Sequence, residues 1–300
     1  MIDLNGAFTA LVTPFNDNAR YLDLDALKRN IHHQAEAGIS GLLPCGTTGE
    51  TPTLSSDEYR QVILTTIDTA KPLGLTVIAG AGSHNTALAV QRHRFVHEAG
   101  AHAALHVTPY YNKPSQEGLY RHFSTIADAS PLPVVLYNIP ARTAVALSLD
   151  TIERLARHPN ICALKEASGS VDFAAQVVAR TDLTLLSGDD PLTLPLASVG
   201  GRGVISVLAN LLPEHVAALC NAFLTDDWAA ARIINDSLLP LARALLTLDT
   251  NPVPVKTAMR LLGRDSGALR LPLCPAEVTV AQQLSELLGA YDLKLAQALA

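Results

Sequence analysis

Lys165 stands directly after the apolar run Ile161–Leu164 and is followed by Glu166. If that run is a buried strand, the lysine side chain projects from its end into a poorly solvated site. Desolvation disfavours the ammonium form and lowers the pKa of a lysine from about 10.4 toward neutrality. A neutral amine attacks a ketone to form a Schiff base. The alternative is an ordinary strand end with Lys165 paired to Glu166, and spacing alone favours that alternative.

Two more candidates follow the apolar run Val134–Leu136. Tyr137 comes next in the chain, and Arg142 lies a little farther on. A tyrosine beside a Schiff-base lysine can pass a proton to the carbinolamine oxygen. The planar guanidinium of an arginine matches a carboxylate. Taken alone, such a tyrosine is more often a buried aromatic and such an arginine a surface charge.

Two loops offer polar groups that suit small anions or a contact between subunits. The segment Gly46-Thr47-Thr48-Gly49-Glu50 has backbone N–H groups and two hydroxyls that can cradle an anion, although an ordinary turn explains it as well. It lacks the Lys-Ser or Lys-Thr of a nucleotide-binding loop. Tyr110 and Tyr111 are adjacent in a loop flanked by prolines, which suits either a subunit contact or a hydroxyl in a site.

Short apolar runs recur along the chain, and each is followed by turn residues and an amphipathic stretch. The runs are Ala7–Val12, Gly41–Cys45, Thr76–Ala79, Ala103–Val107, Val134–Tyr137, Ile161–Leu164, Thr184–Leu186 and Gly203–Val207. Runs of this kind are typical of parallel strands buried on both faces. The pattern predicts an α/β fold, a (β/α)₈ TIM barrel over residues 1–227, with a C-terminal helical subdomain over 228–300. The candidate residues then lie at strand ends, where such barrels place their functional groups.

Composition narrows the class of protein further. The 300 residues are 48% hydrophobic and 17% charged, which is typical of a globular chain, and the net charge of -6 argues against general nucleic-acid binding. The longest stretch without charged residues, 72–91, contains glycines and polar residues and does not suit a membrane span. The N-terminus resembles no signal peptide, and the four scattered cysteines form no metal-ligand pattern. We therefore expect a cytoplasmic protein with no metal site.

The motifs together resemble the dihydrodipicolinate synthases, a family within the pyruvate-dependent aldolase and N-acetylneuraminate lyase superfamily. The resemblance covers nearly the whole chain. The occurrence of all these motifs together, in the same order as in the family, favours the catalytic interpretation of Lys165. The matching segments are Thr9–Phe15, Gly46–Glu50, Val107–Asn112, Tyr137–Pro140, Lys165–Gly169, Ser187–Asp190, Gly203–Val207 and Asn251–Lys256.

The resemblance implies an activity and a set of catalytic residues. The activity is condensation of pyruvate with L-aspartate 4-semialdehyde to 4-hydroxy-tetrahydrodipicolinate, on the route to lysine and diaminopimelate, with no metal or organic cofactor. Lys165 would form the imine with pyruvate, and Tyr137 would donate and accept protons. Thr48 and Tyr111 would link Tyr137 to solvent, with Tyr111 inserted from a neighbouring subunit. A homotetramer built from two tight dimers is implied.

The resemblance also implies the groups that bind the two substrates. Thr47 and Thr48 would hold the carboxylate of pyruvate, while Gly188 and the carbonyl of Ile205 would line the pyruvate end. Arg142 would hold the carboxylate of the semialdehyde. Sibling aldolases share the lysine and the tyrosine but usually lack this arginine, so Arg142 favours the semialdehyde as substrate.

Some positions depart from the family pattern. Ala144 replaces the usual glycine after Arg-Thr, which affects the loop that aims Arg142. Leu88 stands where lysine-inhibited members carry an acidic residue, His84 where asparagine is common, and Ser56 where histidine is common. Because a leucine cannot balance an ammonium group, we predict weak or absent feedback inhibition by lysine.

Two alternatives remain open from the sequence. One is another pyruvate-dependent aldolase, or a 2-keto-sugar-acid dehydratase, of the same superfamily. The other is a barrel that binds 2-oxo acids without turnover, since a fold does not by itself establish a function.

Overall fold

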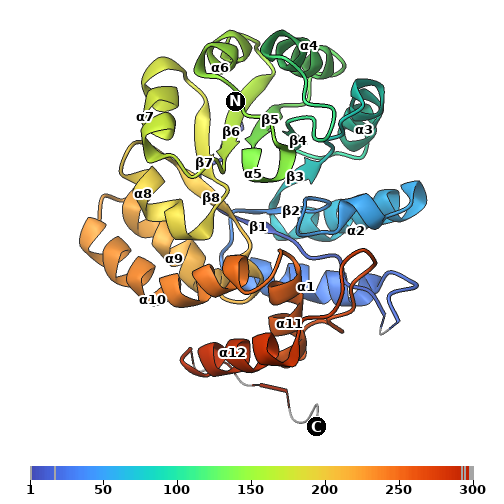
Figure 1. Cartoon of the computed structure of the whole chain (residues 1–300), viewed down its shortest axis with the longest axis vertical. Helices are drawn as coiled ribbons and strands as arrows, with labels where there is room; N and C mark the ends of the chain where they lie inside the picture. Colours follow the sequence, from blue (N-terminus) through green and yellow to red (C-terminus); the bar gives the residue numbers. More distant parts are fainter. Residues whose placement is uncertain (1, 17, 292, 294, 297–300) are drawn as a thin grey trace.

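Parallel strands close into a barrel in the computed structural model, which describes residues 2–16, 18–291, 293, 295 and 296. The strands follow one another in chain order, and β8 pairs with β1 to complete the ring (Figure 1). The strands are β1 (Gly6–Ala10), β2 (Gly41–Leu43), β3 (Thr76–Gly80), β4 (Ala103–Val107), β5 (Val134–Asn138), β6 (Ile161–Glu166), β7 (Thr184–Ser187) and β8 (Gly203–Ser206). The predicted (β/α)₈ barrel is confirmed.

Helices surround the barrel and continue beyond its last strand (Figure 1). The helices up to β8 are α1 (Leu24–Glu36), α2 (Ser56–Ala70), α3 (Thr86–Glu98), α4 (Gln116–Ala127), α5 (Pro140–Thr143), α6 (Leu149–Ala156), α7 (Val171–Arg180) and α8 (Thr193–Ala197). After β8 come α9 (Pro213–Leu224), α10 (Trp228–Thr247), α11 (Val253–Leu261) and α12 (Val278–Gly289). None of the described helices is long and apolar enough to cross a membrane.

The strand bounds differ from the apolar runs in two informative places. Strand β6 continues through Lys165 and Glu166, because its backbone pairing with β5 persists after the apolar residues end. Strand β2 ends at Leu43 rather than Cys45. Pro44 has no N–H to donate to a neighbouring strand, and Cys45 adopts a φ of 55°. Lys165 is therefore held within a hydrogen-bonded strand.

Side chains alternate between the barrel interior and its outer face, as the pleat of a strand requires. Val135, Tyr137 and Ala163 belong to the interior cluster, whereas Leu136 and Leu164 pack toward the surrounding helices. Lys165 follows Ala163 by one full strand period, so its side chain lies on the interior side, at the carboxyl end of the barrel.

The last three helices pack against one another, and α10 packs along α9 (Figure 1). One apolar cluster joins α9 to α10, α11 and α12 and reaches the barrel through Ala7 and Val204. A fully buried ion pair, Lys256 Nζ to Glu50 Oε1 at 2.8 Å, also joins α11 to the loop after β2. A C-terminal helical part is confirmed, and its division from the barrel after residue 227 stays a prediction.

Candidate active site

Lys165 is a buried amine at the barrel mouth. Its side chain is 6% exposed, and burial lowers its pKa to about 7, with the Arg142 charge acting in the same direction and Asp190 opposing it. Glu166 points to the other face of the strand, where its carboxylate accepts hydrogen bonds from Asn138 Nδ2 at 2.9 Å and from the Ser168 N–H. Lys165 is therefore not engaged by Glu166, and with a pKa of about 7 a large fraction of its amine is unprotonated at physiological pH.

The surroundings of Lys165 hold its side chain in place. A Cβ atom added at Gly188 would lie 2.9 Å from Lys165 Cε, so only glycine leaves room for the lysine at this point. Asp190 is half-buried and anchored, since its carboxylate accepts hydrogen bonds from Ser206 Oγ and from the Val207 and Leu208 N–H groups. A fixed negative charge near Lys165 limits how far burial lowers the lysine pKa.

Tyr137 is the neighbour of Lys165 on β5. The two residues are register partners, and Lys165 Nζ lies 4.3 Å from the centroid of the Tyr137 ring. Tyr137 is 5% exposed, and burial raises the pKa of its phenol well above the usual value, although the Arg142 charge opposes this. The phenol is therefore protonated at neutral pH and available as a proton donor.

The loop after β2 is held by contacts from three sides. Thr13 Oγ1 donates to the Gly49 carbonyl at 2.7 Å, and Thr51 Oγ1 donates to the Gly46 carbonyl at 2.9 Å. Thr48 is buried, and its Oγ1 accepts a hydrogen bond of 3.0 Å from Asn251 Nδ2. Thr47 is half-buried and lines the cavity described below. The two predicted threonines thus have different surroundings.

Arg142 lies on the short helix α5, just after β5. Its Nη2 donates to the carbonyl oxygen of Asn251 at 3.2 Å. The helix ends at Thr143, and the next residue, Ala144, has a φ of 57° in the left-handed region that favours glycine. The departure from glycine noted in the sequence therefore falls on a strained backbone position directly beyond Arg142 and Thr143.

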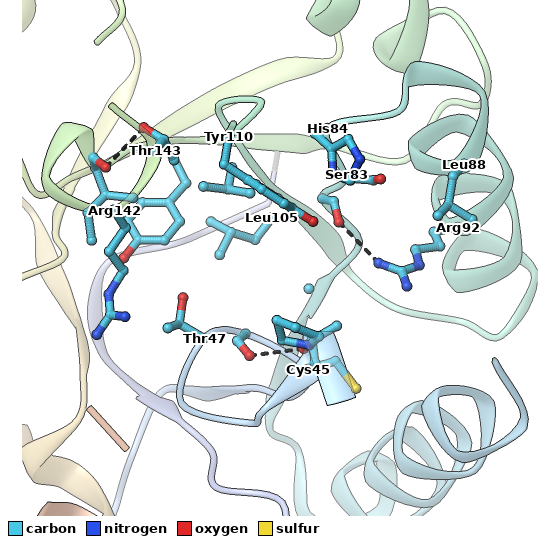
Figure 2. Close-up of a pocket in the computed structure, with 18 of the residues that line it drawn as sticks. Cys45, Thr47, Ser83, His84, Leu88, Arg92, Leu105, Tyr110, Arg142 and Thr143 are labelled. Atoms are coloured by element: carbon cyan, nitrogen blue, oxygen red, sulfur yellow. Dashed lines mark hydrogen bonds between the residues drawn. The ribbon is translucent and has the colours of Figure 1, made fainter. Parts of the chain in front are cut away.

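A cavity of about 410 Å³ connects several of the predicted residues. Tyr137 lines it, and Figure 2 shows Thr47 and Arg142 toward one end and Leu88 and Arg92 at the other. Its remaining lining residues are Cys45, Gly46, Thr51, Pro52, Leu54, Gly80, Gly82, Ser83, His84, Leu105, Val107, Tyr110, Ile139 and Thr143. The volume is ample for two small carboxylic acids, and both ends carry a guanidinium.

The two adjacent tyrosines have different environments. Tyr110 lines the cavity and packs edge-on against His84, with ring centroids 4.7 Å apart. Tyr111 is 90% exposed, with a φ of 72°, and is not among the described residues that line the cavity. Within one chain the structure therefore brings Tyr137, Thr47 and Arg142 together and leaves Tyr111 outside.

The geometry of the site is suited to one kind of chemistry. A near-neutral amine beside a protonated phenol is suited to imine formation with a carbonyl compound, and the arginine and threonines are suited to carboxylates. The model of the dihydrodipicolinate synthetase family matches residues 3–291. The chain belongs to this family. The resemblance seen in the sequence is thereby confirmed.

Individual members of the dihydrodipicolinate synthetase family match over most of their length. The 4-hydroxy-tetrahydrodipicolinate synthase of Nitratidesulfovibrio vulgaris is 47% identical over 292 residues, covering 96% of this chain and 99% of the relative. The solved synthase of Methylacidiphilum fumariolicum is 43% identical with a TM-score of 0.94, covering 97% and 96%. The solved dihydrodipicolinate synthase of Acinetobacter baumannii, a complex with pyruvate, is 37% identical with a TM-score of 0.94, covering 97% and 100%.

Sequence reasoning assigned no role to Asp190 or Asn251, although both lie in matching motifs. Asp190 is anchored at the end of β8, and Asn251 contacts two candidate residues from a distant part of the chain. A weak signal existed for Asn251, because an asparagine directly before a proline marks a turn between two helices. No local pattern indicated which strands that turn would reach.

Proposed function

We propose that this chain is a Schiff-base lyase that condenses pyruvate with L-aspartate 4-semialdehyde to give 4-hydroxy-tetrahydrodipicolinate. The observation that carries the proposal is the buried amine of Lys165, with its pKa lowered to about 7, beside the protonated phenol of Tyr137. The names of the relatives agree with this activity. The reaction belongs to the biosynthesis of lysine and diaminopimelate.

The proposed reaction begins at Lys165. Its neutral Nζ adds to the ketone carbon of pyruvate, and Tyr137 gives a proton to the carbinolamine oxygen so that it leaves as water. The Tyr137 phenolate takes a methyl proton from the resulting iminium, which becomes an enamine. The terminal carbon of the enamine attacks the aldehyde carbon of the second substrate, and the aldehyde oxygen takes that proton back from Tyr137 to become the hydroxyl of the product. The amine of that substrate then adds to the imine carbon and displaces Lys165 as the ring closes.

Substrate binding in this proposal uses the residues around the lysine. Thr47 and Thr48 hold the carboxylate of pyruvate, and Gly188 and the carbonyl of Ile205 border its other side. Gly188 packs against Lys165, and Ile205 is buried in the interior cluster that contains Tyr137, which supports this placement.

Arg142 holds the carboxylate of the semialdehyde in the proposed reaction. Arg142 lines the same cavity as Tyr137, which supports binding of the two substrates side by side, each with its own carboxylate. This arginine separates the proposal from sibling aldolases that act on polyhydroxy chains, because a guanidinium matches a second carboxylate better than a row of hydroxyls.

The proposed assembly is a homotetramer made of two tight dimers, in the cytoplasm. Tyr111 would enter the site of a neighbouring subunit and, with Thr48, relay protons between Tyr137 and solvent. The high exposure of Tyr111 in a single chain supports a contact with a second copy. A purified monomer with full activity would contradict a role for Tyr111 across subunits.

Chemical trapping tests the proposal directly. Incubation with pyruvate followed by borohydride reduction should add a reduced pyruvate adduct at Lys165, located by peptide mass spectrometry. Lys165→Ala should abolish both the adduct and turnover. An unaltered chain that forms no adduct would instead support a non-catalytic 2-oxo-acid-binding barrel. A higher rate with sugar-derived aldehydes than with aspartate semialdehyde would favour a sibling aldolase.

A further inference from the structure

The turn before α11 contacts two of the proposed substrate-binding groups at once. Asn251 Nδ2 donates to Thr48 Oγ1 at 3.0 Å, and Arg142 Nη2 donates to the backbone carbonyl of Asn251 at 3.2 Å. Asn251 is 9% exposed. One residue of the C-terminal helical part therefore lies between the group for the first carboxylate and the group for the second.

The position of Asn251 is itself limited by the helix that follows it, α11. Five residues along the chain, Lys256 Nζ donates to Glu50 Oε1 at 2.8 Å and to the Thr13 carbonyl at 3.0 Å, and the Lys256 and Glu50 side chains are fully buried. Glu50 belongs to the same loop as Thr48. The start of α11 is thus attached to this loop at two points, which limits movement of Asn251 relative to Thr48.

Stability alone does not account for an asparagine at this position. Its Oδ1 is buried and has no hydrogen-bond partner among the described residues. A buried polar atom without a partner lowers the free energy of unfolding, so the packing of this turn does not by itself explain why the position carries an asparagine.

The direction of the amide hydrogen bond supplies that explanation. Because Asn251 Nδ2 donates to Thr48 Oγ1, the hydroxyl proton of Thr48 is not used in that bond and can be donated to another acceptor. A carboxylate accepts hydrogen bonds only, so it needs donors with free protons. The Asn251 carbonyl likewise occupies one nitrogen of Arg142 and leaves the other N–H groups of the guanidinium to bind an anion.

We propose that Asn251 is a positioning residue that orients Thr48 as a donor toward the carboxylate of pyruvate and holds the Arg142 side chain toward the second substrate. This inference rests on the proposed function. It assigns to the C-terminal helical part a direct share in binding both substrates, through one side chain and one backbone carbonyl.

Steady-state kinetics of two variants test the side-chain contribution. Asn251→Ala removes the amide donor and should raise the KM for pyruvate about three- to tenfold with a smaller change in kcat, the range expected for one hydrogen bond. Asn251→Asp should raise this KM further than Asn251→Ala, because a carboxylate accepts the Thr48 proton and repels the substrate anion. A merely structural role predicts the reverse order, because aspartate has nearly the shape of asparagine. Equal or reversed effects on KM would overturn the inference.

A matched control and a double-variant comparison complete the test. Thr257→Ala removes a buried hydroxyl on α11 that donates to the Val253 carbonyl within the same helix, and it should lower the melting temperature without changing either KM. In a Thr48→Val background, Asn251→Ala should add little to the KM for pyruvate. If Asn251→Ala raised the KM for pyruvate in that background as much as it does alone, the inference would be contradicted. This comparison tests the inference even if Asn251→Asp does not fold.

The same experiments distinguish this inference from the proposed function. Borohydride trapping of pyruvate on the unaltered chain tests the function alone. If the unaltered chain forms the adduct and is active, and Asn251→Ala has the same KM for pyruvate, then the role of Asn251 is disproved and the proposed function is not.

Discussion

Lys165 and Tyr137 are register partners on adjacent strands, with Lys165 Nζ 4.3 Å from the centroid of the Tyr137 ring. Their spacing is fixed by the backbone hydrogen bonds of the barrel, so neither side chain depends on a mobile loop. Burial acts on both groups in a useful way. It lowers the pKa of the amine and raises the pKa of the phenol, which yields a nucleophile and a proton donor at the same pH.

The rate of imine formation with pyruvate should rise with pH and level off, with an inflection near pH 7. Only the neutral amine attacks, and burial lowers the pKa of Lys165 to about 7. Single-turnover borohydride trapping across neutral pH measures this rate. Arg142→Gln should move the inflection upward, because it removes a positive charge that disfavours the ammonium form. An inflection near 10, the ordinary value for lysine, would contradict the prediction.

Arg142→Ala should raise the KM for aspartate semialdehyde by about ten- to a hundredfold, the range for losing a hydrogen-bonded charge partner. Imine formation with pyruvate, measured at a pH above its inflection, should change much less, because Lys165 and the threonine loop are intact. Kinetics with each substrate varied in turn, together with borohydride trapping, separate the two effects. An equal loss of imine formation would contradict the role assigned to Arg142. The exposed Arg157→Ala provides a control for loss of a surface arginine.

The sequence was most informative about residues whose position follows from their place along a single strand. The apolar runs and their alternation predicted the barrel, and the residues after those runs predicted Lys165 and Tyr137. Contacts between distant segments were not predictable in this way. The Asn251 contacts to Thr48 and Arg142, and the ion pair of Lys256 with Glu50, depend on how α11 packs on the barrel. No periodic pattern encodes that packing.

Millimolar lysine should inhibit the unaltered chain weakly or not at all. Leu88, 37% exposed on α3, lines the far end of the cavity together with Arg92, so this end presents an apolar surface and a positive charge to an ammonium group. Leu88→Glu should increase lysine affinity up to about fivefold, the scale of an exposed ion pair. Leu64→Glu, at a similarly exposed leucine on α2, is the matched control. Strong inhibition of the unaltered chain would disprove the prediction.

Three buried histidines form a cluster between α3, β4 and α4, outside the proposed site. His93 Nδ1 and His106 Nε2 are 3.1 Å apart, and His122 Nδ1 lies 2.9 Å from Thr86 Oγ1. Burial lowers the pKa of His93 and of His122 to about 4, and that of His106 well below its usual value. All three are therefore neutral in the folded chain at neutral pH.

The free energy of unfolding should fall as the pH drops from about 6.5 toward 4, because the unfolded chain takes up protons on these histidines before the folded chain does. In that pH range each histidine changes the free energy of unfolding by at most about 1.4 kcal/mol per pH unit, and well above it the contribution vanishes. Burial raises the pKa of Asp189 to about 6, so protonation of Asp189 stabilises the folded chain over the same pH range. The effect of the histidines is therefore measured as the difference between variants. Urea unfolding across this range should give a shallower slope for His106→Gln and an unchanged slope for His32→Gln, at an exposed histidine. Parallel profiles for His106→Gln and the unaltered chain would show that the cluster does not govern acid stability.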